Sequence, residues 1–286
     1  MWARELRRCG AIGKRILMAE GTLQEKMPSP RGLPSGEVLL VKAGFRVRLA
    51  GSETDLLHAS ELRARCFGRE KADQDLFDRF CFHILVEREV DGRILGVFRL
   101  RHLTSQQEMA RCYTAQSYGL GPALQRLKPG SSIGELGRFC IDPDVSGADV
   151  ARLAWAGLTV MVERLEIKML IGCSSFQGND PSLYLHAFAL LQARYLAPSD
   201  WQPGAKAAEY ITFIDLLSDR DQARDLDLSQ ALRQMPPLLR NYLTLGGCVS
   251  DHLVQDRDLG TMHVFTALDI EAIPEKRKAG FRALLR

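Results

Sequence analysis

Residues 133–141 form an apolar stretch that is interrupted by two charged residues, Glu135 and Arg138. Such a stretch predicts a strand that is buried on both faces, where an unpaired charge is costly. A buried carboxylate can act as a general base, and a guanidinium can hold a substrate carboxylate through two hydrogen bonds. A structural ion pair between the two side chains explains the pattern equally well.

Gly137 lies between the two charges. Side chains three positions apart in a regular strand point to opposite faces, but a bulge at Gly137 would turn Glu135 and Arg138 toward one cleft. The bulge would also expose backbone N–H groups that could stabilise an oxyanion. We therefore predict a catalytic group in which Glu135 is the general base, directly or through a water, beside the Gly137 amides and Arg138. The alternative is that Glu135 only positions Arg138.

The elements that would position this strand alternate between strands and helices. Strands are predicted at residues 44–51, 82–87, 94–101, 133–141, 169–173, 210–214 and 264–268, and helices at 54–66, 148–165, 181–193 and 236–245. Asp91-Gly92 between two apolar stretches predicts a hairpin. This order predicts an α/β fold with a mixed central sheet flanked by helices.

Composition excludes several classes of protein. The longest apolar run, residues 153–162, is too short for a membrane span, which needs about 20 residues. The seven cysteines are scattered singly, which predicts reduced thiols in the cytoplasm, and neither they nor the histidines show the spacing of a metal site. The net charge of +3 is concentrated in residues 1–17, so no second basic stripe indicates nucleic-acid binding.

Residues 1–36 differ from the remainder of the chain because they are basic and then rich in Pro, Gly and Ser. We predict a flexible N-terminal extension and linker over 1–36, followed by a single domain, 37–286, with a C-terminal extension. The alternative for the extension is a basic amphipathic segment in peripheral contact with the inner membrane.

Several further motifs precede the charged strand in a recurring order. They are Arg63 with Phe67, Asp75 with Asp78, Gly96 with Arg99, and then Glu135 with Arg138 and Phe139. Over residues 60–145 this pattern resembles the acyl-homoserine-lactone synthase branch of the GNAT-like acyltransferases. The resemblance implies a GNAT-like fold, an acyl carrier protein as donor and the α-amine of an amino acid as acceptor.

The second half departs from the lactone synthases. Segments 172–181, 235–247 and 258–270 resemble the related L-ornithine Nα-acyltransferases, and the tryptophan that lactone synthases carry soon after Phe67 is missing. This resemblance implies transfer of a 3-hydroxy fatty acyl group from acyl carrier protein to L-ornithine, the first step of ornithine lipid biosynthesis. The alternatives are a lactone synthase, another amino-acid N-acyltransferase, and a non-catalytic GNAT-like binding module.

The proposed transfer assigns roles to the other charged residues. Arg99 or Arg138 would hold the ornithine carboxylate, whereas Asp75 or Asp78 would take the side-chain ammonium or order the N-terminal lid. Arg63 would anchor the N-terminal segment to an aspartate. We add Phe67 and Phe139 to the substrate-binding group, and assign the acyl and pantetheine region to Ser174, Ser175, Phe176, Gly178 and Asn179.

The segment after the charged strand is a poor cradle for the pyrophosphate of coenzyme A. It has a single glycine, Gly147, and two acidic residues, Asp142 and Asp144. This favours a donor whose one phosphate lies on the pantetheine arm of an acyl carrier protein, so we expect no separate cofactor. Because carrier proteins are acidic, an exposed Lys/Arg patch is expected near the site.

Overall fold

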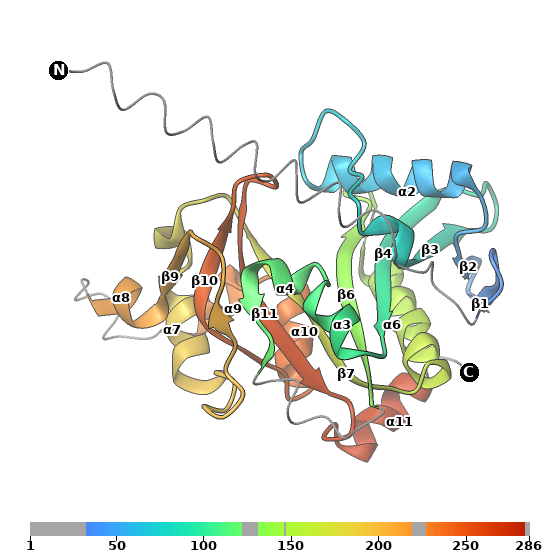
Figure 1. The fold of residues 1–286 in the computed structure, drawn as a ribbon. Coiled ribbons are helices and arrows are strands. Elements are labelled where there is room, and N and C mark those ends of the chain that lie inside the picture. Colours follow the sequence, from blue (N-terminus) through green and yellow to red (C-terminus); the bar gives the residue numbers. More distant parts are fainter. Residues whose placement is uncertain (1–32, 122–130, 146, 219–226, 284–286) are drawn as a thin grey trace.

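The charged strand, β6 (Ser132–Ile141), lies at the centre of a nine-stranded sheet with the order β1-β2-β3-β4-β6-β7-β11-β10-β9 (Figure 1). The computed structural model describes residues 33–121, 131–145, 147–218 and 227–283. Only β6 and β7 run parallel, and the other neighbours are antiparallel. The sheet is therefore mixed, and the predicted α/β class is confirmed.

Eight further strands complete this sheet. They are β1 (Val38–Lys42), β2 (Phe45–Leu49), β3 (Phe82–Arg88), β4 (Ile94–Leu103), β7 (Ile167–Gln177), β9 (Tyr210–Thr212), β10 (Cys248–Asp256) and β11 (Thr261–Asp269). A separate two-stranded pair joins β5 (Tyr118–Gly119) to β8 (Gly204–Ala205).

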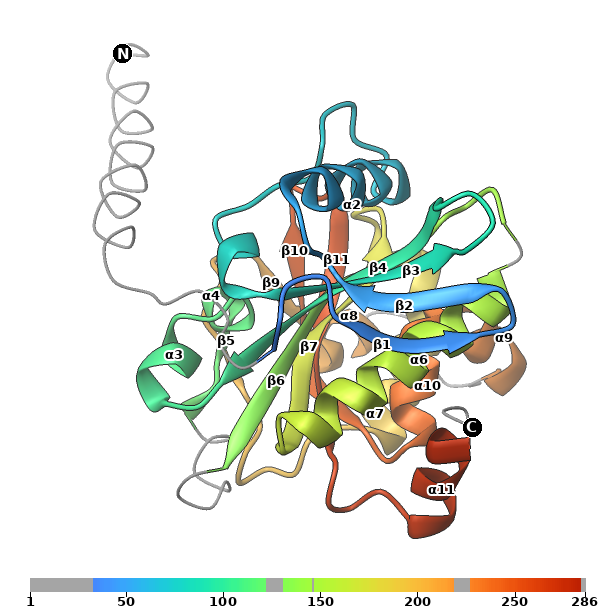
Figure 2. The same ribbon diagram turned by 90° about the vertical axis from the view of Figure 1, so that its right-hand side faces the viewer.

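Helices cover both faces of the sheet. Helix α2 (Glu53–Cys66) packs on Leu85, Val97 and Cys140, whereas α6 (Gly147–Arg164) packs on the opposite face, and Figure 2 shows the two helices on either side of the strands. The other helical segments are η1 (Asp78–Phe80), α3 (Gln106–Ala110), α4 (Thr114–Ser117), η2 (Pro181–Tyr184), α7 (Leu185–Arg194), α8 (Phe213–Ser218), α9 (Leu228–Gln234), α10 (Pro237–Thr244) and α11 (Glu275–Ala283).

Strands β6 and β7 part in the middle of the sheet. Their pairing ends at Leu136 and Gly172, although β6 continues to Ile141 and β7 to Gln177. A Cβ at Gly172 would lie 2.5 Å from the Leu136 carbonyl oxygen, so the strands touch there and separate beyond it. Gly172 belongs to the strand predicted at 169–173 and lies inside β7, where only glycine permits this close approach.

Gly172→Ala is expected to lower the free energy of unfolding by about 1–3 kcal/mol, because the added methyl must push β6 and β7 apart. Urea denaturation measures the change. Gly204→Ala is the matched control, since nothing lies within 4 Å of the position of its Cβ, and it should leave stability almost unchanged. Equal stability of Gly172→Ala and the unaltered protein would contradict the close approach.

The predicted bulge in β6 is present, but the unusual backbone falls on the neighbouring residue. In the pairing of β6 with β4, Gly137 lies opposite Arg99, and Cys140 lies opposite Val97. Strand β6 therefore has one residue more than β4 between these two pairs. Arg138 has a φ of 51°, in the left-handed region, where a residue with a side chain costs about 1–2 kcal/mol. Gly137 is adjacent to this strained residue and is not itself the strained position.

Two other predicted elements differ from the structure. The helix expected at 181–193 is divided into η2 and α7, because the Asp180 side chain caps Ser182 N–H and starts a short 3-10 turn. The strand expected at 210–214 ends at Thr212, whose hydroxyl accepts the N–H of Asp215 and begins α8. Strands β1 and β10 were not predicted.

Candidate active site

The bulge brings Arg138 to the face of the sheet that also carries Arg99. Gly137 lies opposite Arg99, and a Cβ on Gly137 would lie 3.3 Å from the Arg99 Nε, so the glycine leaves room for that side chain. Glu135 lies opposite Arg101 two pairs along the same ladder and shares this face. Glu135 and Arg138 therefore share one face, as predicted, but Glu135 is not among the residues that line a cleft there, so the prediction that both would turn toward one cleft is wrong for Glu135.

Three arginines and three aspartates form one buried network below the parted strands. Arg138 donates from Nε to Asp73 at 2.9 Å and from Nη2 to Asp75 at 3.0 Å. Arg99 donates from Nη1 to Asp75 at 2.6 Å and to Asp78 at 2.7 Å. The structure therefore brings together Arg99, Arg138, Asp75 and Asp78 as the sequence pattern predicted.

Arg63 completes this network from helix α2. Its side chain is 1% exposed, and it donates from Nε to Asp73 and from Nη1 to Asp78, both at 2.8 Å. Arg63 is thus paired with aspartates, whereas its predicted role in anchoring the N-terminal segment stays a prediction. Asp73, the residue at the centre, was not among the predicted site residues.

The network sets the charge state of its aspartates. Burial alone would raise the pKa of Asp73, but the Arg138 and Arg63 guanidinium groups outweigh it, and the pKa is lowered. Burial likewise opposes ionisation of Asp78, while hydrogen bonds and charge from Arg63 and charge from Arg99 hold its pKa well below the usual range. Both carboxyl groups are ionised at neutral pH, so their negative charge is already balanced by arginines.

Two aromatic rings flank the Arg138 guanidinium. Its Cζ lies 5.0 Å from the ring centre of Tyr113 and 5.7 Å from that of Phe67, within the range of a cation–π contact. Phe67 is thus in the site as predicted, whereas Tyr113 was missed. Phe139 stacks on Phe98 with ring centres 5.5 Å apart and packs with α6 on the other face of the sheet, so it does not reach this side.

Glu135 lies beneath Tyr113. Its carboxylate is buried, and its two oxygens accept the backbone N–H groups of Tyr113, at 3.2 Å, and Thr114, at 2.6 Å. The two bonds fix the start of α4 and hence the ring that contacts Arg138. This geometry favours the alternative in which Glu135 positions Arg138, here through Tyr113.

A cleft of about 730 Å³ opens above the network, a size typical of small-molecule sites. One wall is lined by Arg138 from β6, Asp75 from the loop after α2 and Tyr113 at the start of α4. The opposite wall comes from the β10–β11 hairpin, with Asp256 and His263. Arg138 therefore faces the open space, whereas Arg99 is not among the lining residues.

The chemistry of the cleft is set by charge and by one neutral imidazole. Burial lowers the pKa of His263 to about 4, although the nearby Asp256 charge opposes the shift, so the imidazole is neutral at pH 7. Tyr113 donates its hydroxyl to Asp256 at 3.1 Å. Together these groups can bind a ligand that carries both a carboxylate and an ammonium.

The predicted acyl and pantetheine residues occupy β7 and the turn after it. Ser174 is buried and accepts the Thr266 hydroxyl at 2.8 Å, while Phe176 is fully buried against Phe188, with ring centres 4.8 Å apart. Both are therefore held in the strand and its core, and neither lines the cleft. Ser175 is half-buried, and Gly178 and Asn179 form the exposed turn, in which Gly178 has a φ of 75°.

The segment predicted to be a poor pyrophosphate cradle is occupied by ion pairs. Asp142 is buried and accepts Arg93 at 2.7 Å and Arg65 at 3.2 Å, and its other oxygen accepts the N–H of Asp144. These negative charges precede the start of α6, where an anionic phosphate would otherwise bind. Arg65 and Arg93 are about half-exposed, but both are paired with Asp142 and Asp144, and neither lines the cleft. The exposed Lys/Arg patch expected for a carrier protein stays a prediction.

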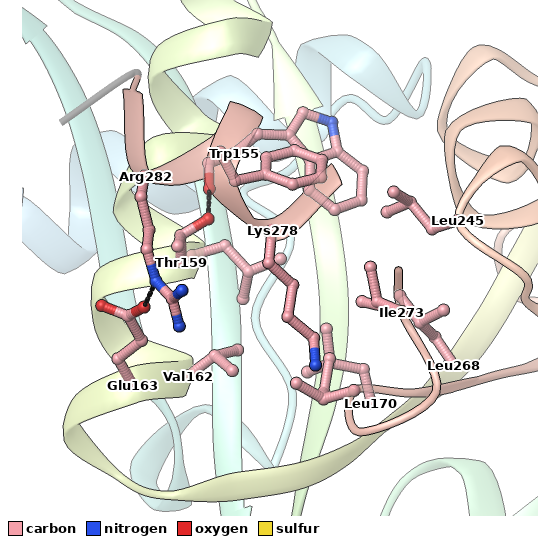
Figure 3. A pocket seen from close by; sticks show the side chains of 13 residues that line it. Trp155, Thr159, Val162, Glu163, Leu170, Leu245, Leu268, Ile273, Lys278 and Arg282 are labelled. Atoms are coloured by element: carbon pink, nitrogen blue, oxygen red, sulfur yellow. Dashed lines mark hydrogen bonds and ion pairs between the residues drawn. The ribbon is translucent and has the colours of Figure 1, made fainter. Parts of the chain in front are cut away.

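A second hollow lies on the opposite side of the sheet, between α6 and α11 (Figure 3). It is lined by apolar side chains such as Trp155, Leu170 and Leu268, and its rim is closed by the ion pair of Arg282 with Glu163. Its volume of about 110 Å³ is well below that of ordinary ligand pockets. The larger polar cleft is therefore the stronger candidate for chemistry.

Comparisons with known proteins agree with the fold. Residues 58–156 match the family model described as an acetyltransferase (GNAT) domain, which spans Arg63, Arg99 and Arg138. L-ornithine N(alpha)-acyltransferase of Brucella abortus is 31% identical over 266 residues, covering 84% of this chain and 89% of that protein. The chain belongs to the L-ornithine Nα-acyltransferase family.

Other members of this acyltransferase family match over a similar length. L-ornithine N(alpha)-acyltransferase of Rhizobium meliloti is 29% identical and covers 84% of this chain and 85% of that protein. Among solved structures, the N-acyl amino acid synthase FeeM from uncultured soil microbes has a TM-score of 0.46 at 11% identity, over 80% of this chain and 93% of that one. The family assignment rests on the sequence relatives.

Three residues of this acyltransferase site could not be recognised by spacing. Tyr113 and Asp256 are 143 positions apart and meet only in the fold, and His263 belongs to a strand that reads as ordinary core. Asp73 carried a weak signal, because it stands two residues before Asp75 in the same acidic segment.

Some expectations for this family member concern parts that are not described. The predicted extension, 1–36, lies outside the described residues up to position 32. Within residues 33–121, 131–145, 147–218 and 227–283, no helix is long and apolar enough to cross a membrane. No cluster of three metal-binding side chains occurs in the same part of the chain.

Proposed function

We propose that this protein transfers a 3-hydroxy fatty acyl group from acyl carrier protein to the α-amine of L-ornithine. The observation that carries the proposal is Arg138, which a β-bulge turns into a cleft of about 730 Å³ in a member of the L-ornithine Nα-acyltransferase family. The product would be lyso-ornithine lipid, and its long chain would leave at the inner membrane face.

The amino acid would bind by its carboxylate to Arg138. Two aspartates use the Nε and one Nη2 donor of this arginine, and a guanidinium has five N–H donors, so others are left for the cleft. Arg99 is less suited, because its side chain is 3% exposed and lies behind the lining residues. The α-amine of the bound ornithine would then lie near the parted strands.

The acyl thioester would enter where β6 and β7 separate. Beyond Leu136 the edge of β6 that faces β7 has no strand partner, so backbone N–H groups around Gly137 are the proposed donors to the oxyanion. The α-ammonium first gives a proton to solvent, and the lone pair of the free amine then forms the C–N bond at the thioester carbon. The C–S bond breaks as the nitrogen gives up a second proton. The pantetheine thiolate leaves and takes up a proton.

An acyl carrier protein is the proposed donor because the segment before α6 is unfavourable for a pyrophosphate. Asp142 and Asp144 place carboxylates there, and the two arginines that could otherwise attract a phosphate, Arg65 and Arg93, are already paired with them. Purified protein should therefore acylate ornithine with 3-hydroxyacyl-carrier protein much faster than with the matching coenzyme A thioester, as measured by mass spectrometry. Exclusive use of the coenzyme A thioester would contradict this donor.

A panel of amino acids tests the acceptor in the same assay. Transfer to ornithine in preference to lysine, glutamine and S-adenosylmethionine supports the proposal. A lactone product from S-adenosylmethionine would identify a lactone synthase instead. No transfer to any amine would indicate a non-catalytic binding module.

Glu135→Gln separates the two roles of Glu135. Because its oxygens bind two backbone N–H groups, we expect the variant to lose about 1–2 kcal/mol of stability and about 10- to 100-fold in kcat, with the shape of the pH profile retained. Kinetics at several pH values and thermal denaturation measure these effects. Loss of the ascending limb of the pH profile with unchanged stability would instead identify Glu135 as the general base.

A further inference from the structure

The carboxylate of Asp256 lines the cleft and has no ion-pair partner among the described residues. It ends β10, and its two oxygens accept the N–H of Leu259 at 3.0 Å and the hydroxyl of Tyr113 at 3.1 Å. It is half-buried and lines the cleft. Within the described ranges, no lysine or arginine forms an ion pair with it, so its negative charge is not neutralised by the protein.

The other acidic residues of the cleft are less available. Asp73 and Asp75 are each shared by two or more arginines of the buried network. Glu209 pairs with Arg257 at 2.7 Å on the exposed rim. Asp258 is exposed to solvent, where an added charge pair contributes little.

Tyr113 sets the distance between Asp256 and Arg138. The Arg138 guanidinium lies over its ring, and its hydroxyl contacts Asp256 at the other end. The positive and negative groups are therefore separated by little more than one tyrosine side chain. Ornithine has a similar length between its carboxylate and its terminal ammonium.

We propose that Asp256 holds the side-chain ammonium of the acceptor and so selects a diamino acid. This inference rests on the proposed function. It replaces the role first expected for Asp75 or Asp78, whose charges are taken by Arg63, Arg99 and Arg138. The acceptor lies along Tyr113, with its carboxylate on Arg138 and its side chain toward the β10–β11 hairpin.

Asp256→Asn tests this role with two acceptors, ornithine and norvaline, which differ in the terminal ammonium. We expect kcat/KM for ornithine to fall about 10- to 100-fold, mainly through KM, because one charge-assisted bond is lost. Turnover of norvaline should change by less than about twofold, since its side chain has no charge to bind. Asp258→Asn, on the same rim, is the matched control and should leave both acceptors unaffected.

Asp256→Glu provides a second variant that keeps the charge. Its carboxylate reaches one methylene further into the cleft, so preference should move from ornithine toward the shorter 2,4-diaminobutyrate. An equal loss for ornithine and norvaline in Asp256→Asn would overturn the inference and indicate a role at the α-amine. Unchanged ornithine selectivity in both variants would also overturn it. If the unaltered protein acylates no amino acid, the proposed function itself fails, which is a distinguishable result.

Discussion

Arg138→Met is expected to lower kcat/KM for the amino-acid acceptor by about 100- to 1000-fold, because a charge-assisted, bidentate contact to its carboxylate is lost. Methionine keeps most of the length of the side chain and can pack between Phe67 and Tyr113. The loss should appear mainly in KM, since the carboxylate is bound equally in the ground state and the transition state. Steady-state kinetics at a saturating acyl donor measure it.

The matched control for this variant is Arg257→Met. Arg257 lines the same cleft, but its side chain is 74% exposed and its only ion pair is with Glu209 within the described part of the chain. It should change kcat/KM by less than about threefold, since exposed pairs contribute little. Near-normal kinetics of a folded Arg138→Met protein would exclude Arg138 from acceptor binding.

Asp73→Asn is expected to lower the free energy of unfolding by about 3–5 kcal/mol, because it breaks buried pairs and leaves Arg63 and Arg138 without their shared partner. The Asp73 side chain is 1% exposed and accepts both arginines on one oxygen. Urea denaturation should show a lower midpoint with an unchanged slope.

The effect of Asp73→Asn should depend on pH. The pKa values of Asp73 and Asp78 in the folded protein lie below the value of about 4 in the unfolded chain. The stabilisation that these two carboxylates give is therefore present above about pH 4 and is lost as the pH falls through their folded-state pKa values. The difference between the variant and the unaltered protein should therefore shrink in acid. Asp144→Asn is the control, because its carboxylate is 69% exposed in weak pairs, and it should cost less than about 1 kcal/mol. A full-sized Asp73→Asn effect at pH 2 would contradict the charge argument.

The sequence predicted most of the fold because its main elements carry local signals. Apolar periodicity and the Asp91-Gly92 turn located β3, β4, β6 and α6. Strand β10 was missed because His252 and Ser250 are polar yet buried, so its alternation is weak. Helix α11 has no buried residue and hence no apolar stripe by which to recognise it.

The site could be predicted only in part for a related reason. Arg63, Asp75, Asp78, Arg99 and Arg138 follow one another within the segment that forms the network, so their order was informative. The far wall of the cleft comes from the β10–β11 hairpin, and its contact from Asp256 to Tyr113 depends on the sheet order. Nor could spacing show that Glu135 binds two backbone N–H groups, because that contact depends on where α4 begins.

The most direct test of the central claim uses ornithine labelled with nitrogen-15 at its α-position and a 3-hydroxyacyl-carrier protein. Mass spectrometry of the product locates the acyl group, and the same reaction is run with Arg138→Met. We expect a product acylated on the labelled α-nitrogen, formed by the unaltered protein and almost absent with the variant. Acylation on the side-chain nitrogen, or full product formation by a folded Arg138→Met protein, would contradict this expectation.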